Sequence, residues 1–303
     1  MAKAFLITGA SSGIGFDIVK HLASLNHQVY ATARKKTDLD NLDKIKNVIP
    51  LELDVTKPDQ ILKALSIIKS NNSSLYGLVN NAGLGGIGGF TTWNEEELQQ
   101  IFDVNVYGPW RMTNALIGLL IKSQGRIVNI GSQGGMITDK FFGPYTMTKH
   151  ALEAYTAALR LELEAHHVKV SIVQPGGIET DIVSNSMPGI IRRFKRAISP
   201  FKEEADQVLE SFQEPLSPPD DEQESKSNRK PSSVKIVTDA VHHALFSDYP
   251  KPCYLVGTKW EGDRVINGLL KKIVLENDNP KHNYSRDELI MMLDKHLSAH
   301  PSN

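Results

Sequence analysis

The sequence has only one cysteine among its 303 residues, Cys253. A single cysteine cannot form an internal disulfide framework or a cysteine-rich zinc module. Its scarcity fits a reducing compartment, and we expect a cytoplasmic protein. For Cys253 itself the favoured interpretation is a small buried hydrophobic side chain.

Long apolar runs are also missing. A membrane-spanning helix needs roughly 18 to 20 apolar residues, and the best candidate, 115–121, is a short part of an amphipathic stretch. The apolar run at 1–8 is too short for a secretory signal and leads directly into a glycine-rich turn. We therefore expect a soluble protein, in contact with a membrane at most at its periphery.

Charge of one sign is not in excess either, because 34 Lys and Arg stand against 35 Asp and Glu. A net charge of -1 excludes recruitment of nucleic acid by bulk electrostatics. The ten histidines are scattered, without carboxylates or cysteine at ligand spacing, so we expect no metal site. Hydrophobic residues make up 40% of the chain, which permits a sizeable core.

Short apolar runs alternate with longer segments of helical period, which indicates repeated βα units. Strands are predicted at 4–8, 28–33, 48–53, 75–80, 126–130, 169–174 and 253–256. Helices are predicted near 14–25, 58–69, 95–121, 145–164 and 235–246. The pattern predicts an α/β fold of the Rossmann type, a doubly wound parallel sheet of seven strands with helices on both faces. We expect one catalytic domain at 1–260, followed by a helical extension at 261–303.

One long insert interrupts this alternation at 181–233, between the sixth and seventh strands. Residues 187–213 alternate apolar and basic side chains, which predicts a helix with one apolar and one basic face. Residues 215–233 contain Leu216 among Pro, Ser, Asp, Glu, Lys and Asn, and this composition cannot bury enough apolar surface to fold. We expect a lid whose second part is flexible.

The motif Thr8-Gly9-Ala10-Ser11-Ser12-Gly13-Ile14-Gly15 follows the first predicted strand and opens the first predicted helix. Glycines there permit a tight turn and close approach of the backbone to a pyrophosphate, and the helix N-terminus supplies amide donors. A glycine-rich turn without a ligand is the alternative, but the strand and helix on either side favour a dinucleotide site.

Further motifs follow in a fixed order: Asn80-Asn81-Ala82-Gly83, Asn105, Ser132, the pair Tyr145 and Lys149, and Pro175-Gly176 with Thr180. With the glycine motif, this set resembles the classical short-chain dehydrogenase/reductase family over about residues 3–181. The length of the chain, its long insert and its C-terminal extension are more similar to the hydroxysteroid and retinol dehydrogenases of this family than to its compact acyl-carrier ketoreductases. The resemblance implies the catalytic residues Asn105, Ser132, Tyr145 and Lys149, with Asn105 anchoring a water that links Lys149 to solvent. It also implies cofactor contacts at Gly9, Ser11, Ser12, Gly13, Ile14, Gly15, Arg34, Asp54, Val55, Asn81, Ala82, Gly83, Tyr145, Lys149, Pro175, Gly176, Ile178 and Thr180.

The side chains themselves indicate a proton-transfer site. A tyrosine phenol titrates near pH 10, and a neighbouring ammonium group lowers that pKa. Tyr145 and Lys149 are four residues apart, so on a helix they share a face. Ser132 can hydrogen-bond the substrate oxygen while Tyr145 donates or accepts a proton. We expect an oxidoreductase that interconverts a ketone or aldehyde with an alcohol by hydride transfer.

Cofactor choice depends on the end of the second predicted strand. NAD needs an acidic side chain there for the ribose hydroxyls, and NADP needs a cation for the 2′-phosphate. Ala33 occupies the acidic position of the family register, and Arg34 follows. The guanidinium of Arg34 suits phosphate, and the hydroxyl of Ser11 could assist. NADP(H) is therefore expected rather than NAD(H), with a solvated basic loop as the alternative.

The insert also bears on the substrate and on partners. Ile178, Ile182, Val183, Met187 and Ile190 would suit a hydrophobic substrate such as a steroid, retinoid or lipid-like ketone, or else pack the lid against the domain. The basic stretch at 192–202 could touch an anionic membrane. By family analogy we expect a homo-oligomer, a dimer or a tetramer. An NADPH-binding regulator or scaffold without turnover is the alternative function.

Overall fold

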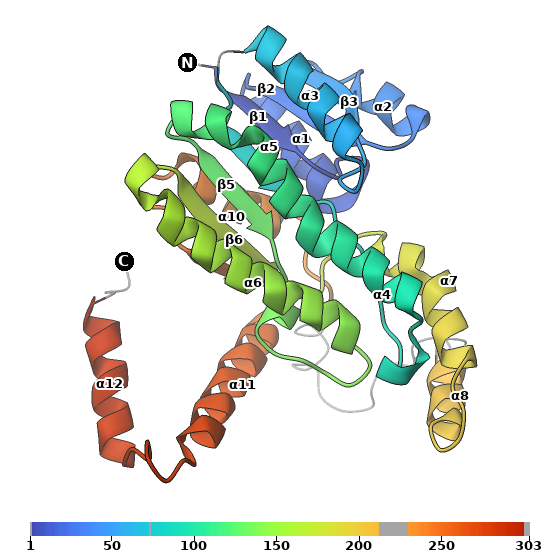
Figure 1. Cartoon of the computed structure of the whole chain (residues 1–303), viewed down its shortest axis with the longest axis vertical. Helices are drawn as coiled ribbons and strands as arrows, with labels where there is room; N and C mark the ends of the chain where they lie inside the picture. Colours follow the sequence, from blue (N-terminus) through green and yellow to red (C-terminus); the bar gives the residue numbers. More distant parts are fainter. Residues whose placement is uncertain (1, 73, 212–229, 300–303) are drawn as a thin grey trace. The chain divides into compact units, whose positions relative to one another are not determined.

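The computed structural model describes residues 2–72, 74–211 and 230–299 (Figure 1). Contacts divide the chain into two units, Met1–Gly262 and Asp263–Asn303, which are described separately. The expected flexible segment at 215–233 lies outside the described residues except for 230–233.

A parallel sheet of seven strands forms the centre of the first unit. The strands are β1 (Ala4–Ile7), β2 (Gln28–Ala33), β3 (Val48–Glu52), β4 (Gly77–Asn80), β5 (Arg126–Ile130), β6 (Lys169–Pro175) and β7 (Cys253–Val256). Their order across the sheet is β3-β2-β1-β4-β5-β6-β7. This order confirms the predicted doubly wound fold. The winding direction reverses between β1 and β4, where the carboxyl ends of the strands leave a crevice in such folds.

Helices connect the strands and cover both faces of the sheet. They are α1 (Gly13–Ser24), α2 (Lys36–Leu42), α3 (Pro58–Asn71), α4 (Glu95–Phe102), α5 (Gly108–Lys122), α6 (Gly143–Leu163), α7 (Ile182–Lys195), α8 (Lys202–Ser211) and α10 (Lys235–Phe246). Figure 1 shows α3, α5 and α6 in front of the sheet, with α10 behind it. Helix α2 was not among the predicted helices.

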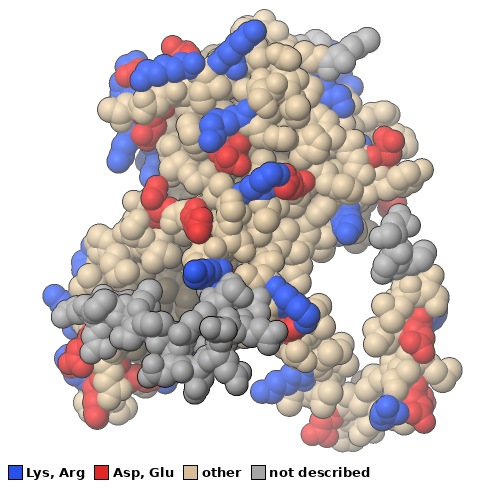
Figure 2. Space-filling view, turned by 180° about the vertical axis from the view of Figure 1, so that it is seen from behind, with Lys and Arg blue, Asp and Glu red and all other residues tan. Residues whose placement is uncertain are grey.

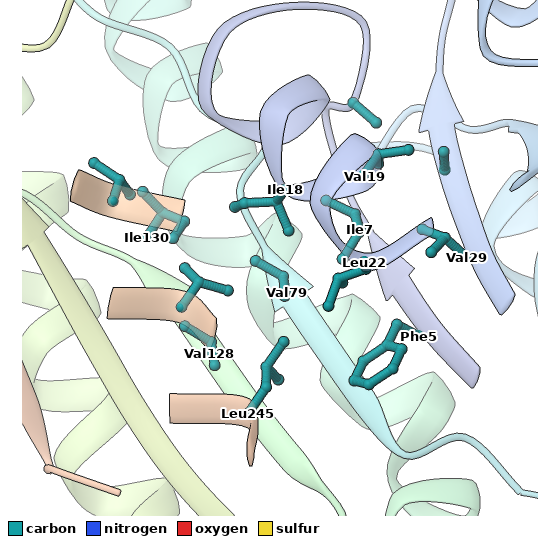
Figure 3. Close-up of a cluster of buried hydrophobic side chains, with 14 of the residues drawn as sticks. Phe5, Ile7, Ile18, Val19, Leu22, Val29, Val79, Val128, Ile130 and Leu245 are labelled. Carbon is teal, nitrogen blue, oxygen red and sulfur yellow. The ribbon is translucent and has the colours of Figure 1, made fainter. Parts of the chain in front are cut away.

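Alternate side chains of the central strands enter two separate cores. Phe5 and Ile7 of β1 pack with α1 and α10, while Leu6 of the same strand packs with α3 and α5. Figure 3 shows side chains from β1, β4 and β5 meeting those of α1 and α10, including Ile18 and Leu245. A strand buried on both faces needs an almost continuous apolar run, which is why these strands were recognisable in the sequence.

Two local predictions were wrong. The single helix expected at 95–121 is divided, because α4 ends at Phe102 and a π-helical turn, Asp103–Tyr107, precedes α5. Pro109 in the first turn of α5 has no N–H to continue an unbroken ladder of hydrogen bonds. Cys253 is exposed rather than buried, because it begins β7, which lies beside β6 at the edge of the sheet formed by the described strands.

The second unit contains most of α11 (Lys259–Asn277) and all of α12 (Arg286–Ala299). Among its described residues Val265 is the buried hydrophobic, and α12 has no buried residue. Apolar side chains such as Val274, Leu275 and Met291 are well exposed. Within the described parts of the chain, no helix combines the length and the apolar character needed to cross a membrane.

Candidate active site

The site residues expected from the sequence gather at the carboxyl edge of the sheet, because each group follows a strand. The glycine motif follows β1, Arg34 follows β2, Asp54 follows β3, Asn81 follows β4 and Ser132 follows β5. The segment 175–180 starts at the last residue of β6. In a parallel sheet these ends all meet at one edge, so residues far apart in the sequence become neighbours.

The glycine motif forms a cradle in which side chains have no room. Gly9 and Gly13 have φ values of +64° and +55°, which favour glycine. A Cβ atom at Gly15 would lie 2.4 Å from the carbonyl oxygen of Gly9. Ser12 begins α1 without a side-chain cap, so the first amides of the helix remain available to an anion. This backbone fits the pyrophosphate of a dinucleotide.

A hydrogen-bond network between β1 and β4 fixes the cradle. The Thr8 hydroxyl accepts from the backbone N–H groups of Asn81 and Ala82, both at 3.0 Å. The Asn81 amide donates to the carbonyl oxygens of Thr8 and Gly9, both at 2.9 Å. Gly9 must be a glycine here, because a Cβ atom would lie 2.8 Å from the Cα of Ala82. The Asn-Asn-Ala-Gly motif therefore holds the glycine-rich loop after β1 in place.

Asn105 lies in the π-helical turn and is 1% exposed. Its amide oxygen accepts from the N–H of Leu84 at 2.7 Å, and its amide nitrogen donates to the Leu84 carbonyl at 2.9 Å. The same nitrogen donates to the Thr148 hydroxyl on α6 at 3.1 Å. Asn105 therefore joins the loop after β4 to the helix of Tyr145. A π-turn inside a helix often marks a functional site.

Ser132, Tyr145 and Lys149 are brought together by β5 and α6. The Ser132 hydroxyl accepts from the N–H of Gly134 at 3.0 Å and lies close enough to the Tyr145 phenol to lower the pKa of that phenol. The Lys149 ammonium group lies 5.8 Å from the centre of the Tyr145 ring and donates to the Ile130 carbonyl at 2.9 Å. This group can hold a carbonyl oxygen and pass a proton to it.

Burial controls the pKa values of this group. It raises the pKa of Tyr145, and the hydrogen bond with Ser132 offsets only part of that rise. Burial also lowers the pKa of Lys149 to about 8, against the opposing charge of Glu153. The sequence predicted that the ammonium group of Lys149 lowers the pKa of Tyr145. In the protein without a bound cofactor, burial instead raises the pKa of Tyr145. The ammonium group instead bonds the Ile130 carbonyl.

The residues expected at the adenosine end lie on two neighbouring loops. Ala33 ends β2 and is buried, and the Arg34 side chain is 66% exposed, 4.0 Å from the Asp54 carboxylate. Asp54 also accepts from the N–H and the hydroxyl of Thr56, at 2.9 and 2.8 Å. The Val55 carbonyl accepts from Arg111 at 3.3 Å. Arg34 therefore has the exposure that a phosphate ligand needs.

The lid helix α7 follows the segment 175–180 and is attached by a buried arginine. Arg193 was expected on the basic face of an amphipathic helix, but it is buried, with 5% of its surface exposed. Its guanidinium lies 3.9 Å from the centre of the Trp93 ring, donates to the Ile87 carbonyl at 2.9 Å and pairs with Glu97 at 3.4 Å. Glu97 also pairs with Arg196 at 2.6 Å. We call Trp93, Glu97, Arg193 and Arg196 the lid clamp.

The lid clamp changes the interpretation of the basic stretch at 192–202. Besides Arg193 and Arg196, Arg192 lies 3.9 Å from Glu97, and Lys202 pairs with Asp206. Most of these cations therefore have partners within the protein. Lys and Arg are intermixed with Asp and Glu on the face seen in Figure 2, without a large area of one sign.

Sequence reasoning missed two carboxylates beside the site. Glu153 follows Lys149 by four residues on α6 and accepts from Gln174 of β6 at 2.9 Å. The spacing of Tyr145, Lys149 and Glu153 could have revealed this stripe. Glu261 accepts from the N–H of Gly177 at 2.6 Å across 84 residues, and no local signal indicates that contact. Among the described residues, no three His, Cys, Asp or Glu side chains form a group that could hold a metal ion.

Comparisons with known proteins agree with this geometry. The sequence model of the family described as short chain dehydrogenase matches residues 3–190. The mitochondrial D-beta-hydroxybutyrate dehydrogenase of Bos taurus is 32% identical over 272 residues, which cover 84% of this chain and 76% of that protein. Retinol dehydrogenase 7 of Rattus norvegicus is 31% identical over 264 residues, with 84% and 80% covered. A short-chain dehydrogenase from Streptomyces avermitilis has a similar crystal structure, with a TM-score of 0.73, 27% identity, and 91% and 94% coverage.

Proposed function

The chain belongs to the short-chain dehydrogenase/reductase family of oxidoreductases, which act on CH–OH groups with a nicotinamide cofactor, and we propose that it interconverts a hydrophobic ketone or aldehyde with its alcohol using NADP(H). The observation that carries the proposal is the convergence of Ser132, Tyr145 and the buried Lys149, whose ammonium group lies 5.8 Å from the centre of the Tyr145 ring. Three side chains from two elements converge there with the chemistry that carbonyl reduction needs.

The chain's own residues have separate roles in this proposal. The cradle of Gly9, Gly13 and Gly15 binds the pyrophosphate, and the segment 175–180 contacts the nicotinamide end. When bound, the cofactor supplies the hydride. Ser132 donates a hydrogen bond to the substrate oxygen and orients it toward Tyr145. The phenol of Tyr145 then passes its proton to that oxygen.

Lys149 is proposed to favour ionisation of the Tyr145 phenol. Its ammonium group stabilises the phenolate that remains after proton transfer, because a nearby positive charge favours the ionised form of a phenol. Asn105 holds the loop after β4 and the start of α6 at a fixed distance through Leu84 and Thr148. In this role Asn105 supports the water that the family resemblance implies between Lys149 and solvent.

Preference for NADP(H) is supported by the end of β2. Ala33 presents no carboxylate to the ribose, and Arg34 is exposed within reach of Asp54. Similar structures were solved with either type of cofactor: an enzyme from Burkholderia cenocepacia with NADP and one from Brucella melitensis with NADH. Fold similarity therefore does not choose between them, and the proposal depends on Ala33 and Arg34.

A hydrophobic substrate is supported by the lid. Ile182 and Val183, in the first turn of α7, expose much of their surface directly after the proposed nicotinamide segment. Ile190 and Phe194 of the same helix are buried in a separate small core with Ala197 and Ala205. The first turn of α7 is thus available to a substrate, and the later turns of this helix pack in the small core that attaches the lid. A retinol dehydrogenase among the relatives fits a lipid-like alcohol.

Assembly and location are further parts of the proposal. Trp110 of α5 and Met147 and Leu161 of α6 are exposed apolar side chains on the helices expected to pair between subunits. They support a homo-oligomer, a dimer or a tetramer. We retain the cytoplasm as the proposed location, although relatives from Bos taurus, Mus musculus and Rattus norvegicus are mitochondrial by name. The charges of the stretch 192–202 do not favour contact with a membrane, because Arg192, Arg193, Arg196 and Lys202 have partners within the protein.

The test compares oxidation of NADPH and NADH with ketosteroids, retinal, medium-chain ketones and β-ketoacyl thioesters. Tyr145→Phe removes the proton donor and should abolish turnover while NADPH still binds. Turnover that depends on Tyr145 supports the enzyme and identifies its cofactor and substrate class. NADPH binding without turnover of any of these carbonyls would favour the second candidate, a cofactor-binding regulator or scaffold. The intact Ser132, Tyr145 and Lys149 argue against that candidate.

A further inference from the structure

Glu261 lies in the first turn of α11, and its two carboxylate oxygens accept hydrogen bonds from different partners. One oxygen accepts from the N–H of Thr258 at 2.8 Å and from the Thr258 hydroxyl at 3.2 Å. The N–H of Glu261 donates back to the Thr258 hydroxyl at 3.3 Å. This reciprocal pattern is a capping box that starts a helix. It accounts for only one of the two oxygens.

The other oxygen reaches the segment proposed to contact the nicotinamide. It accepts from the N–H of Gly177 at 2.6 Å. Gly177 is the second residue after β6, between Gly176 and Ile178. A hydrogen bond to an ionised carboxylate is shorter and about twice as strong as one between neutral groups. Glu261 therefore ties this segment to the start of the C-terminal helix.

Two glycines, Gly176 and Gly257, leave room for the carboxylate of Glu261. A Cβ atom at Gly176 would lie 2.3 Å from one carboxylate oxygen, and a Cβ atom at Gly257 would lie 2.4 Å from the other. Gly257 also has a φ of +150°. A capping box with Thr258 would not require a glycine at 176. The backbone on both sides is therefore shaped around the carboxylate of Glu261.

The Gly177 backbone also has a second hydrogen-bond partner, Ser232. The Gly177 carbonyl accepts from the N–H of Ser232 at 2.8 Å, and the N–H of Glu179 donates to the Ser232 carbonyl at 3.0 Å. Both polar groups of the Gly177 backbone thus have partners, one from α11 and one from the end of the insert. The segment is held in position by the protein alone, before any cofactor binds.

We propose that Glu261 is a positioning residue for the nicotinamide end of the cofactor, acting through Gly177. This inference rests on the proposed function, because it assumes that the segment 175–180 contacts the nicotinamide. The adenosine end is bound elsewhere, at the glycine cradle and Arg34. Loss of the Gly177 contact should therefore impair orientation of the nicotinamide and leave binding of the adenosine half intact.

The experiment compares Glu261→Gln with Thr258→Ala in the full-length protein. Glutamine also forms capping boxes, but its amide group has one oxygen and one NH2 group, so only one of the two oxygen positions of Glu261 keeps an acceptor. Thr258→Ala removes hydroxyl bonds of the capping box and leaves the Gly177 contact in place. Melting temperatures of the two variants show whether α11 is weakened to a similar extent.

Three measurements separate positioning from simple support. We expect kcat with NADPH to fall about tenfold in Glu261→Gln and to stay within about twofold of wild type in Thr258→Ala. The dissociation constant of 2′-phospho-ADP-ribose, which lacks the nicotinamide, should be unchanged in both. The fluorescence of bound NADPH, which reports the surroundings of the nicotinamide, should change in Glu261→Gln alone.

Equal effects of the two variants on kcat and on bound-cofactor fluorescence would overturn the inference, as would no effect of Glu261→Gln. A wild-type protein that binds NADPH but reduces no carbonyl would count against the proposed function only. The fluorescence comparison, which needs no substrate, would still decide the role of Glu261. Failure of the wild type to bind NADPH and NADH would overturn both proposals.

Discussion

At the scale of single residues, the pKa of Lys149 gives the clearest expectation. Burial holds this pKa at about 8, and the carboxylate of Glu153 opposes that effect. In the proposed mechanism Lys149 must be charged to stabilise the phenolate of Tyr145. As the pH rises through about 8, Lys149 loses its proton, so kcat/KM for carbonyl reduction should fall. A pH profile of the wild-type enzyme measures this limb.

Glu153→Gln tests whether the fall in kcat/KM at high pH comes from deprotonation of Lys149. The substitution removes the charge that raises the pKa of Lys149 and keeps an oxygen for Gln174. The fall in kcat/KM should then begin at a lower pH than in the wild type. Glu162→Gln, which removes an exposed carboxylate from the same helix, is the control and should leave the profile in place. A Glu153→Gln profile identical to wild type would contradict the assignment of the limb to Lys149.

Arg34 gives a second expectation at this scale. Arg34→Ala removes the cation proposed to bind the 2′-phosphate, and a hydrogen bond to a charged group contributes about 1.5 to 3 kcal/mol. The KM for NADPH should rise by about tenfold or more, and the KM for NADH should change little. Lys44→Ala, which removes an exposed lysine bonded to Asn41, is the control. An equal loss with both cofactors would argue against a phosphate contact at Arg34.

Some contacts of the candidate site could be predicted from the sequence, and others could not. The order of the motifs predicted the glycine cradle and the approach of Tyr145 to Ser132, because each motif follows a strand of a parallel sheet. It predicted neither the direction of the Tyr145 pKa nor the contact of Glu261 with Gly177. Both depend on burial and on contacts between distant segments, and a local pattern carries no information about either.

At the scale of elements, the lid clamp should control how firmly α7 is attached. Arg193→Gln removes the stack on Trp93 and the ion pair with Glu97. Breaking a buried ion pair from one side costs about 3 to 5 kcal/mol. We expect faster proteolysis within the lid and a higher KM for the carbonyl substrate, with a smaller change in kcat. Limited proteolysis and steady-state kinetics measure these effects.

A matched control for this prediction is Arg192→Gln. Arg192 also faces Glu97, but at 3.9 Å and with a side chain that is 62% exposed. Exposed ion pairs contribute about 0 to 1 kcal/mol, so this substitution should leave proteolysis and KM close to wild type. If the two variants are equally resistant to proteolysis, the buried arginine does not hold the lid.

The elements also show where a periodic pattern misleads. An amphipathic pattern assigns every arginine to the solvated face, yet Arg193 is buried. Gly86 and Gly88 make this possible, because a Cβ atom at Gly86 would lie 2.5 Å from Trp93 and one at Gly88 would lie 3.0 Å from Arg193. The space for a buried guanidinium is thus created by glycines more than a hundred residues earlier. Helical periodicity cannot reveal a partner on another segment.

At the scale of the whole molecule, the two units should differ in their contribution to stability. Helix α12 has no buried residue, so its removal exposes no core. A chain that ends at residue 285 should keep the melting temperature of the wild type to within about 2 °C and should keep its NADPH turnover. Differential scanning calorimetry and the kinetic assay measure both. A clear loss of stability or turnover would show that α12 has a partner in solution.

The sequence predicted the first unit better than the second. In the first unit, alternation of buried strands and amphipathic helices leaves few possible topologies, because parallel crossovers have one hand. The C-terminal extension was predicted only as helical. Its apolar side chains are not organised around a buried core, so the sequence pattern does not indicate where they pack.

The cofactor cradle also has a consequence for biosynthesis. Its walls come from Thr8 and Asn81, which are 73 residues apart, and from Gly13, which packs against Thr180. A chain that leaves the ribosome N-terminus first cannot close this cradle until residue 180 has emerged, and Glu261 follows later still. The nicotinamide cofactor therefore cannot template the folding of a shorter nascent chain. We expect the cofactor to be captured only by a polypeptide from which residue 180 has already emerged.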